Sequence, residues 1–189
     1  MNSSLPDIDS ISHIHAVVFD LDGTLLNSRR ELTSNTIRAV SALMERGIFP
    51  VIATGRSYQA VLKYKGELKI STPVICYNGS VIYNSTTGEE QHSVTLPEDI
   101  ARAAIRHGRK NNLHTQGFRH GQLCHERVTA DAEYYQEVTG LKGKIVNFDN
   151  YNPLELTKLM YVSSEREKIT RIAKYMDAEY WDRQNQCYS

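Results

Sequence analysis

Two aspartates, Asp20 and Asp22, follow an apolar segment near the N-terminus and are separated by a single residue. The apolar segment, residues 16–19, is rich in β-branched residues, which is typical of a buried parallel strand. Because side chains alternate along a strand, both carboxylates are predicted to lie on the same side of it. Two carboxylates this close need a cation or a shared proton, and carboxylates together with substrate phosphate are typical ligands of Mg²⁺. The pair therefore predicts a magnesium site at the end of the strand, and an acidic turn that closes a core strand is the alternative.

A second group of polar residues follows the apolar residues 48–53. Thr54, Gly55 and Arg56 stand between that predicted strand and a predicted helix. A hydroxyl and free backbone N–H groups at a strand end, just before a helix, form a natural cradle for phosphate. We therefore predict a phosphate-binding turn here, with Ser57 capping the helix. A plain strand-to-helix turn is the alternative.

A sheet is needed to bring these two groups together. Thr33 is predicted to cap a helix that ends at Gly47, between the first two strands. A strand, a helix and a second strand in this length form a right-handed crossover unit of a parallel sheet. A third strand is predicted at residues 73–76, followed by a hairpin with strands at 81–83 and 92–94.

From Leu96 onward the pattern changes. Helices and antiparallel-type strands occur there without strict alternation, which indicates a separate α+β module. In its first helix, Ile100, Ala103 and Ala104 are predicted to face inward. The predicted helices of this module are 97–111, 130–138 and 164–176, and its predicted strands are 113–118, 122–126, 144–148 and 156–162.

Two motifs in these segments resemble those of the haloacid dehalogenase superfamily. The string Val17-Val18-Phe19-Asp20-Leu21-Asp22-Gly23-Thr24-Leu25 resembles its first motif, and Ala53-Thr54-Gly55-Arg56 is similar to the second motif in its Cof-type branch. The segment Ile75-Cys76-Tyr77-Asn78-Gly79-Ser80 looks like the place where the Cof-type core leads into its cap. The dipeptide Asn78-Gly79 also favours a tight turn by itself, and both interpretations stay open.

The resemblance implies a phosphatase mechanism. Asp20 is the expected nucleophile, forming an aspartyl-phosphate, and Asp22 is the expected acid and base. The side chain of Asp20 and the backbone carbonyl of Asp22 are expected to bind Mg²⁺. Thr54 and the Gly55 amide are expected to hold the phosphoryl oxygens, with Arg56 near the substrate and Asn78 at the mouth of the site. The implied partner is a small phosphorylated metabolite, such as a sugar phosphate or a flavin-type phosphate.

The resemblance also implies the domain organisation. We expect an α/β fold, with a Rossmann-like parallel-sheet core that carries an inserted α+β cap. Residues 1–14 are expected to form a disordered leader, residues 15–84 the core, and residues 85–189 the cap, with the chain ending near the return to the core. In Cof-type enzymes such a cap gates the pocket and selects the substrate.

Two further motifs that the resemblance implies are not found in the sequence. These are a later Lys and an acidic cluster of the type Gly-Asp-x-x-Asn-Asp, and no Gly-Asp follows Asp22. The chain is therefore expected to be truncated relative to the family, with an open sheet edge through which it could self-associate. Whether it keeps the activity is left open. A non-catalytic binding or interaction protein is the alternative, and a phosphomutase is a further one.

The composition excludes other classes of function. The 22 basic and 22 acidic residues give a formal net charge of zero, without the basic excess of a nucleic-acid-binding protein. No apolar run approaches the roughly 20 residues needed to cross a bilayer, and the N-terminus lacks a signal-peptide pattern. The three widely spaced cysteines, Cys76, Cys124 and Cys187, indicate reduced thiols and a cytoplasmic protein.

Histidines gather in the second module and raise the question of a metal site there. No pair has the spacing of metal ligands with a supporting Asp or Glu. They are therefore predicted to lie at the surface or to face a substrate. The histidines concerned are His107, His114, His120 and His125.

Overall fold

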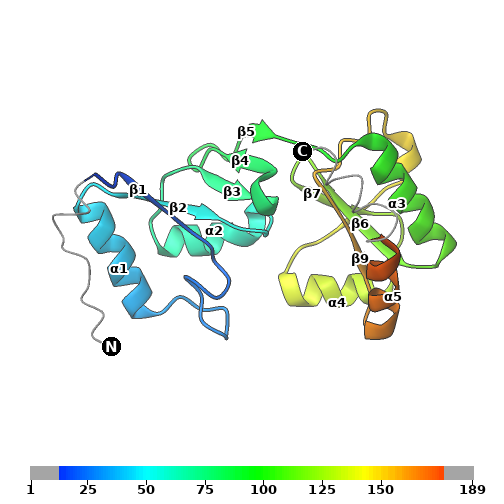
Figure 1. The fold of residues 1–189 in the computed structure, drawn as a ribbon, viewed down its shortest axis with the longest axis horizontal. Helices are drawn as coiled ribbons and strands as arrows, with labels where there is room; N and C mark the ends of the chain where they lie inside the picture. The colour runs from blue at the N-terminus through cyan, green and yellow to red at the C-terminus, as the bar shows by residue number, and fades with distance from the viewer. Residues whose placement is uncertain (1–12, 177–189) are drawn as a thin grey trace. The chain divides into compact units, whose positions relative to one another are not determined.

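The computed structural model describes residues 13–176 (Figure 1). The chain divides between Val94 and Thr95 into two units, each with its own sheet. The boundary predicted from the sequence lay between residues 84 and 85, ten residues earlier. The difference arises because the segment after residue 84 returns as a strand that pairs within the first sheet. Most of the predicted leader, and Cys187, lie outside the described residues.

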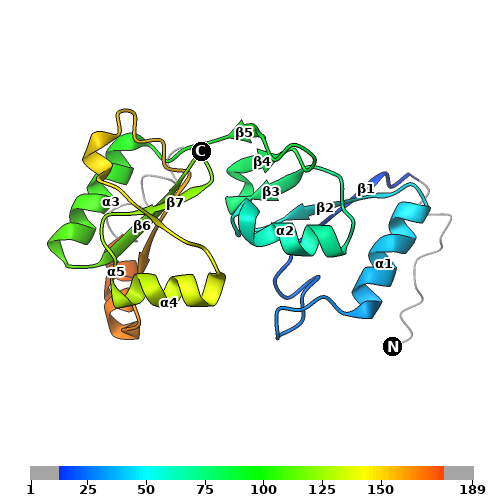
Figure 2. The same cartoon turned by 180° about the vertical axis from the view of Figure 1, so that it is seen from behind.

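The sheet of the first unit begins with the predicted parallel strands. Its strand order is β1-β2-β3-β4-β5, with β1, β2 and β3 parallel and the last two strands antiparallel (Figures 1 and 2). This arrangement confirms the α/β fold with a parallel-sheet core. The strands are β1 (Ala16–Phe19), β2 (Phe49–Ala53), β3 (Val74–Cys76), β4 (Val81–Tyr83) and β5 (Glu90–Ser93).

Two helices accompany this sheet, α1 (Ser34–Glu45) and α2 (Tyr58–Glu67). The Thr33 hydroxyl accepts a hydrogen bond from the backbone N of Thr36, so it caps α1 as predicted. Ser57 occupies the N-cap position of α2 but makes no side-chain cap hydrogen bond, which departs from the prediction.

Strand β1 lies at the end of the described sheet. It pairs with β2 on one side, through the register Ala16 with Phe49 to Phe19 with Ile52, and no other described strand pairs with it. Ile52 is fully buried, whereas Val18 and Phe49 are 58% and 60% exposed. The core of this unit therefore lies toward β2, β3 and β4, and the expected open edge lies beside β1.

The second unit contains a four-stranded sheet of order β8-β7-β6-β9. The pairs β6–β7 and β6–β9 are antiparallel, while β7 and β8 are parallel. This mixed arrangement agrees with the α+β character expected after Leu96. Its strands are β6 (His114–Arg119), β7 (Gln122–His125), β8 (Lys144–Ile145) and β9 (Lys158–Val162), and its helices are α3 (Glu98–Lys110), α4 (Ala130–Thr139) and α5 (Arg166–Met176).

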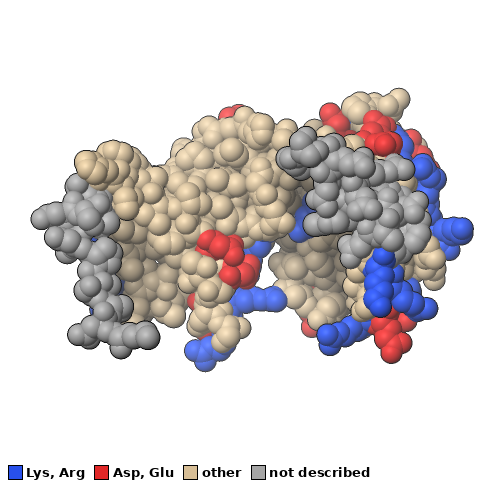
Figure 3. Space-filling model, viewed as in Figure 1, with Lys and Arg blue, Asp and Glu red and all other residues tan. Residues whose placement is uncertain are grey.

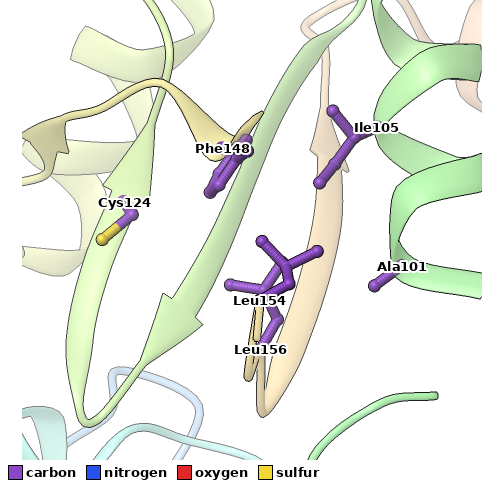
Figure 4. Close-up of a cluster of buried hydrophobic side chains, with 6 residues drawn as sticks. All are labelled: Ala101, Ile105, Cys124, Phe148, Leu154 and Leu156. Atoms are coloured by element: carbon purple, nitrogen blue, oxygen red, sulfur yellow. The ribbon is translucent and has the colours of Figure 1, made fainter. Parts of the chain in front are cut away.

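The core of the second unit lies between α3 and the sheet. Figure 4 shows the cluster of Ala101, Ile105, Cys124, Phe148, Leu154 and Leu156, of which Phe148, Leu154 and Leu156 are fully buried. Helix α3 buries Ala101, Ala104, Ile105 and Gly108. Of the residues predicted to face inward, Ala104 is buried, whereas Ile100 and Ala103 are only partly buried. The buried face of α3 is therefore rotated about the helix axis relative to the predicted one.

Two of the histidines predicted to be accessible are buried in this unit. His114 is 2% exposed and His125 is 6% exposed, and their rings meet edge to face at 5.3 Å. They lie on the adjacent strands β6 and β7. Basic and acidic side chains lie interspersed on the face of this unit shown in Figure 3, as expected for a chain of zero net charge.

Candidate active site

An open pocket of about 340 Å³ lies at the carboxyl ends of the parallel strands. In an open parallel sheet this is the edge where ligands bind. The loops after β1, β2 and β3 each contribute to it. Its lining comprises Asp20, Ala53, Thr54, Gly55, Ile75, Asn78 and Gly79.

Asp20 enters the pocket because the chain turns sharply after β1. The strand ends at Phe19, and the backbone N atoms of Leu25 and Leu26 bond to the carbonyls of Asp20 and Leu21. One carboxylate oxygen of Asp20, Oδ1, accepts a hydrogen bond from the backbone N of Leu21 at 2.7 Å. This bond orients the carboxylate, and the second oxygen, Oδ2, takes no part in it.

The predicted phosphate-binding turn is fixed by the neighbouring strand. The backbone N of Thr54 bonds to the carbonyl of Ile75 at 2.9 Å, and the Thr54 carbonyl accepts from the backbone N of Asn78 at 3.1 Å. Thr54 is 5% exposed, and its hydroxyl accepts from the backbone N of Arg56 at 3.3 Å. The turns after β2 and β3 are therefore joined to each other by backbone hydrogen bonds.

Gly55 and Asn78, from these two turns, approach each other closely. A Cβ added to Gly55 would lie 2.6 Å from Oδ1 of Asn78, so a side chain at this position would displace the asparagine. Asn78 has a φ of 57°, in the left-handed region that asparagine tolerates better than most residues. Asn78 therefore lies in a tight turn and also lines the pocket, and its place at the mouth of an active site stays a prediction.

Asp22 does not line this pocket and instead pairs with Arg56. The Arg56 Nε donates to Oδ2 of Asp22 at 2.8 Å, and Nη2 donates to Oδ1 at 2.6 Å. This pairing holds the pKa of the Asp22 carboxyl below its usual value, an effect opposed by partial burial. Strand alternation does not place the two aspartates as predicted, because β1 ends at Phe19, before both of them.

Tyr64 and Arg30 complete this arrangement and were not singled out in the sequence. The Tyr64 hydroxyl accepts from Nη1 of Arg56 at 3.4 Å and donates to the Arg30 carbonyl at 3.1 Å. The guanidinium of Arg56 also lies 5.2 Å from the centre of the Tyr64 ring. No spacing rule signals this contact, because it depends on a loop in which Arg30 has a φ of 60°.

The donor atoms near Asp20 suit a hard cation. Among the described residues no group of three or more His, Cys, Asp or Glu side chains gathers. Mg²⁺ commonly binds through one or two carboxylates and keeps several waters, so such a group is not required. The Asp20 carboxylate and the Asp22 backbone carbonyl are oxygen donors of the suitable kind.

Comparisons with known proteins assign a family. The sequence profile of the haloacid dehalogenase-like hydrolases matches residues 17–188. The chain is 25% identical over 163 residues to the pyridoxal phosphate phosphatase of Escherichia coli, covering 84% of this chain. It is 26% identical over 101 residues, 53% of this chain, to the 5-amino-6-(5-phospho-D-ribitylamino)uracil phosphatase of Bacillus subtilis.

The fold comparison agrees with the sequence comparison. A crystal structure of a Thermotoga maritima protein, TM0651, matches with a TM-score of 0.74 and 24% identity, covering 89% of this chain and 63% of that one. The chain spans 56% of the E. coli relative and 37% of the B. subtilis relative. Within the described residues, no helix is both long and apolar enough to cross a membrane.

Proposed function

The chain belongs to the haloacid dehalogenase-like hydrolases, and on this premise we propose that it acts as a Mg²⁺-dependent phosphatase of small phosphate monoesters. The observation that carries the proposal is the pocket that Asp20 lines together with Thr54, Gly55 and Asn78. A carboxylate nucleophile and donors for phosphoryl oxygens are the two components that such a reaction needs in one place.

In the proposed reaction, the free carboxylate oxygen of Asp20 attacks phosphorus and the ester P–O bond breaks. The product is an aspartyl-phosphate, and the leaving alcohol takes a proton. Water then attacks the aspartyl-phosphate, which releases inorganic phosphate and restores Asp20. The Thr54 hydroxyl and the Gly55 backbone would hold the phosphoryl oxygens during both steps, with Asn78 at the mouth of the pocket.

Asp22 is the proposed acid in the first step and the proposed base in the second. Its pairing with Arg56 favours the ionised carboxylate, which suits removal of a proton from water. Donation of a proton to the leaving oxygen requires Asp22 to be released from Arg56. The proposal therefore gives Arg56 two positions, one on Asp22 and one toward the substrate.

Magnesium fits this site through the carboxylate of Asp20 and the backbone carbonyl of Asp22. When bound, it would neutralise charge on the phosphoryl group and on the nucleophile. The rest of the proposed chemistry belongs to the residues of the chain itself. The two named relatives act on phosphate esters of small metabolites, and we propose a substrate of the same size class. The described cysteines, Cys76 and Cys124, are free thiols, which supports a reducing, cytoplasmic setting.

The test is hydrolysis of p-nitrophenyl phosphate by the purified chain, with Mg²⁺ and with a chelator. We expect turnover that needs the metal and that falls at least about a thousandfold in Asp20→Asn, because the amide is not a nucleophile. Asp99→Asn is the matched control, since Asp99 is an exposed aspartate in the first turn of α3. Absence of turnover in a folded sample, or turnover that survives in Asp20→Asn, would contradict the proposal.

A second candidate function is supported by the exposed edge at β1. Val18 is exposed on β1, whose outer edge no described strand pairs, and Phe49 is exposed on the neighbouring strand β2. Such an edge is suited to pairing with a further strand. A non-catalytic interaction protein that uses this edge would show association without turnover, whereas the phosphatase requires turnover.

A further inference from the structure

A second pocket lies within the second unit, between α4 and strands β6, β7 and β8. We call this pocket, of about 210 Å³, the α4 cavity. That volume equals about seven water molecules at roughly 30 Å³ each, so it has room for a small organic molecule. Four large apolar side chains form much of its walls, together with Ala132 and Gln136 of α4, and Gln116 and His125 lie at its inner side. The four apolar residues are Leu123, Val128, Leu141 and Ile145.

Gln116 lines this cavity and carries a buried hydrogen-bonding group without a partner. Its side chain is 1% exposed, and its Oε1 lies 3.1 Å from Nε2 of His114. Its Nε2 has no hydrogen-bond partner. If the amide is rotated by 180°, the oxygen takes the place of the nitrogen and has no partner instead. One polar atom of this buried amide therefore lacks a hydrogen bond in either orientation. Such a group costs free energy unless something in the cavity binds it.

His125 lies beside Gln116 with the complementary character. The two residues face each other across β6 and β7 in the strand register. Nδ1 of His125 lies 2.6 Å from the Arg127 carbonyl, so Nδ1 carries the proton in the neutral ring. Nε2 is then a hydrogen-bond acceptor. With the Gln116 amide oriented as in the structure, the inner side of the cavity presents a donor from Gln116 next to an acceptor from His125.

The mouth of the cavity selects against a charged ligand. Glu133 and Lys142 both line it, so these two opposite charges add no net charge that would attract an ion. Val128 and Ile145, which are 56% and 61% exposed, give the mouth apolar edges. Placing an ion against neutral groups at the inner side would also cost desolvation free energy that no opposite charge there repays.

From these features we propose that the α4 cavity binds a small neutral molecule that carries a primary carboxamide on a short apolar body. The carboxamide oxygen accepts from Gln116, its NH₂ donates to Nε2 of His125, and the apolar body packs against Leu123 and Leu141. The apolar walls alone would accept many molecules, and the adjacent donor and acceptor select the head group. This site is independent of the proposed phosphatase activity, since all its residues belong to the second unit.

Gly143 provides a means to close the site. A Cβ added there would overlap with Cδ2 and Nε2 of His125, so an alanine fills the space next to the acceptor. Gly66, in α2, has nothing within 4 Å of an added Cβ. Gly143→Ala is therefore the blocking variant and Gly66→Ala is its matched control.

The experiment is a titration of the ¹⁵N-labelled full chain with isobutyramide, followed by NMR of the Gln116 side-chain amide and of α4. We expect saturable shifts with a Kd on the order of millimolar, as suits a ligand of so few atoms. Isobutyrate has the same body but no N–H donor, and should bind at least about tenfold more weakly. Gly143→Ala should abolish the shifts, and Gly66→Ala should keep them.

Three results would overturn the proposal. Absence of saturable shifts with isobutyramide would mean that water fills the cavity. Equal binding of isobutyrate would mean that the donor and acceptor do not select the head group. Unchanged binding in a folded Gly143→Ala variant would place the ligand elsewhere. If that variant does not fold, the comparison of the two probes on the unmodified chain decides the question. Neither probe is a phosphate ester, so failure here leaves the phosphatase proposal untouched.

Discussion

The guanidinium of Arg56 donates two hydrogen bonds, of 2.8 and 2.6 Å, to the carboxylate of Asp22. The two residues are 34 positions apart and come from the loops after β1 and β2. Two parallel N–H···O bonds fix the orientation of a carboxylate more firmly than a single contact does. The pair therefore joins the proposed acid and base to the turn that holds Thr54.

Replacing Arg56 by glutamine should raise the pKa of Asp22, because the hydrogen bond from Arg56 is the largest cause of its lowering. A carboxyl with a lowered folded-state pKa contributes stability above its unfolded value, and this contribution is lost as the pH falls through the folded value. The side chain of Asp22 is 52% exposed, so we expect Arg56→Gln to cost less than about 1 kcal/mol at pH 7.

Urea unfolding of both proteins at pH 7 and near pH 3 measures this difference. Arg38→Gln, on the exposed side of α1, is the control and should be neutral at both values. A cost for Arg56→Gln that is equally large near pH 3 would show that the Asp22 pair is not its source.

Gly55→Ala should damage the pocket without unfolding the unit. Its methyl would lie 2.6 Å from Oδ1 of Asn78, so the asparagine must move away from the proposed phosphate position. We expect p-nitrophenyl phosphate turnover to fall at least about tenfold, since a displacement of about 1 Å in a catalytic site costs that much or more. Gly66→Ala, in the helix α2, should keep its turnover and gain up to about 1 kcal/mol of stability. Full turnover by Gly55→Ala would contradict the assignment of this pocket.

The sequence predicted most of the fold because its signals are local. Thr33 caps α1, and Gly47 follows the C-cap residue of that helix with a φ of 76°, both as predicted from residue type. The parallel core strands were predicted from apolar runs of the expected length. The first two motifs placed Asp20 and Thr54 at strand ends, and both line the pocket.

The sequence did not predict features that depend on tertiary contacts. The partner of Asp22 could not be read from strand alternation, because β1 stops at Phe19 and a turn decides where Asp22 lies. The burial of His114 depends on the elements packed over its strand, and a histidine in a strand carries no signal for that. The boundary expected between residues 84 and 85 fell inside the hairpin that the sequence did predict, and the pairing of its two strands places the division after Val94.

His114 should make the stability of the second unit depend on pH. Burial lowers the pKa of its imidazole, with smaller effects from Gln116 and Asp131, which raise it, and from His125 and Arg127, which lower it. The unfolded chain therefore binds a proton near pH 6.5 that the folded chain does not. Stability is complete above that value and decreases as the pH falls below it, toward the folded-state pKa.

A variant without this imidazole should lose that dependence. We expect His114→Gln to flatten the slope of unfolding free energy against pH between 5 and 7, by no more than about 1.4 kcal/mol per pH unit for one proton. His92→Gln, at an exposed position of β5, is the control. An unchanged slope in a folded His114→Gln protein would mean that another group binds the proton.

Val18→Lys should reduce self-association through the edge at β1. Strand β1 contains neither a charged residue nor a proline, which are the features that proteins commonly use to protect an edge. Val18 is 58% exposed there, beside Phe49 at 60%. A lysine at this position places a charge on the face that another strand would have to cover, whereas Val138→Lys adds the same charge to an exposed position of α4.

Sedimentation velocity over a range of concentrations should show association in the unmodified chain and in Val138→Lys, and its loss in Val18→Lys. Association that persists in Val18→Lys would exclude the edge as the contact. A monomer at every concentration would mean that the edge is not used in solution.

Turnover of p-nitrophenyl phosphate measured on the same samples also separates the two candidate functions, because Val18 lies on the strand that leads to Asp20. A phosphatase that works as a monomer keeps its rate in Val18→Lys, whereas one whose site is completed by a second copy loses rate together with association.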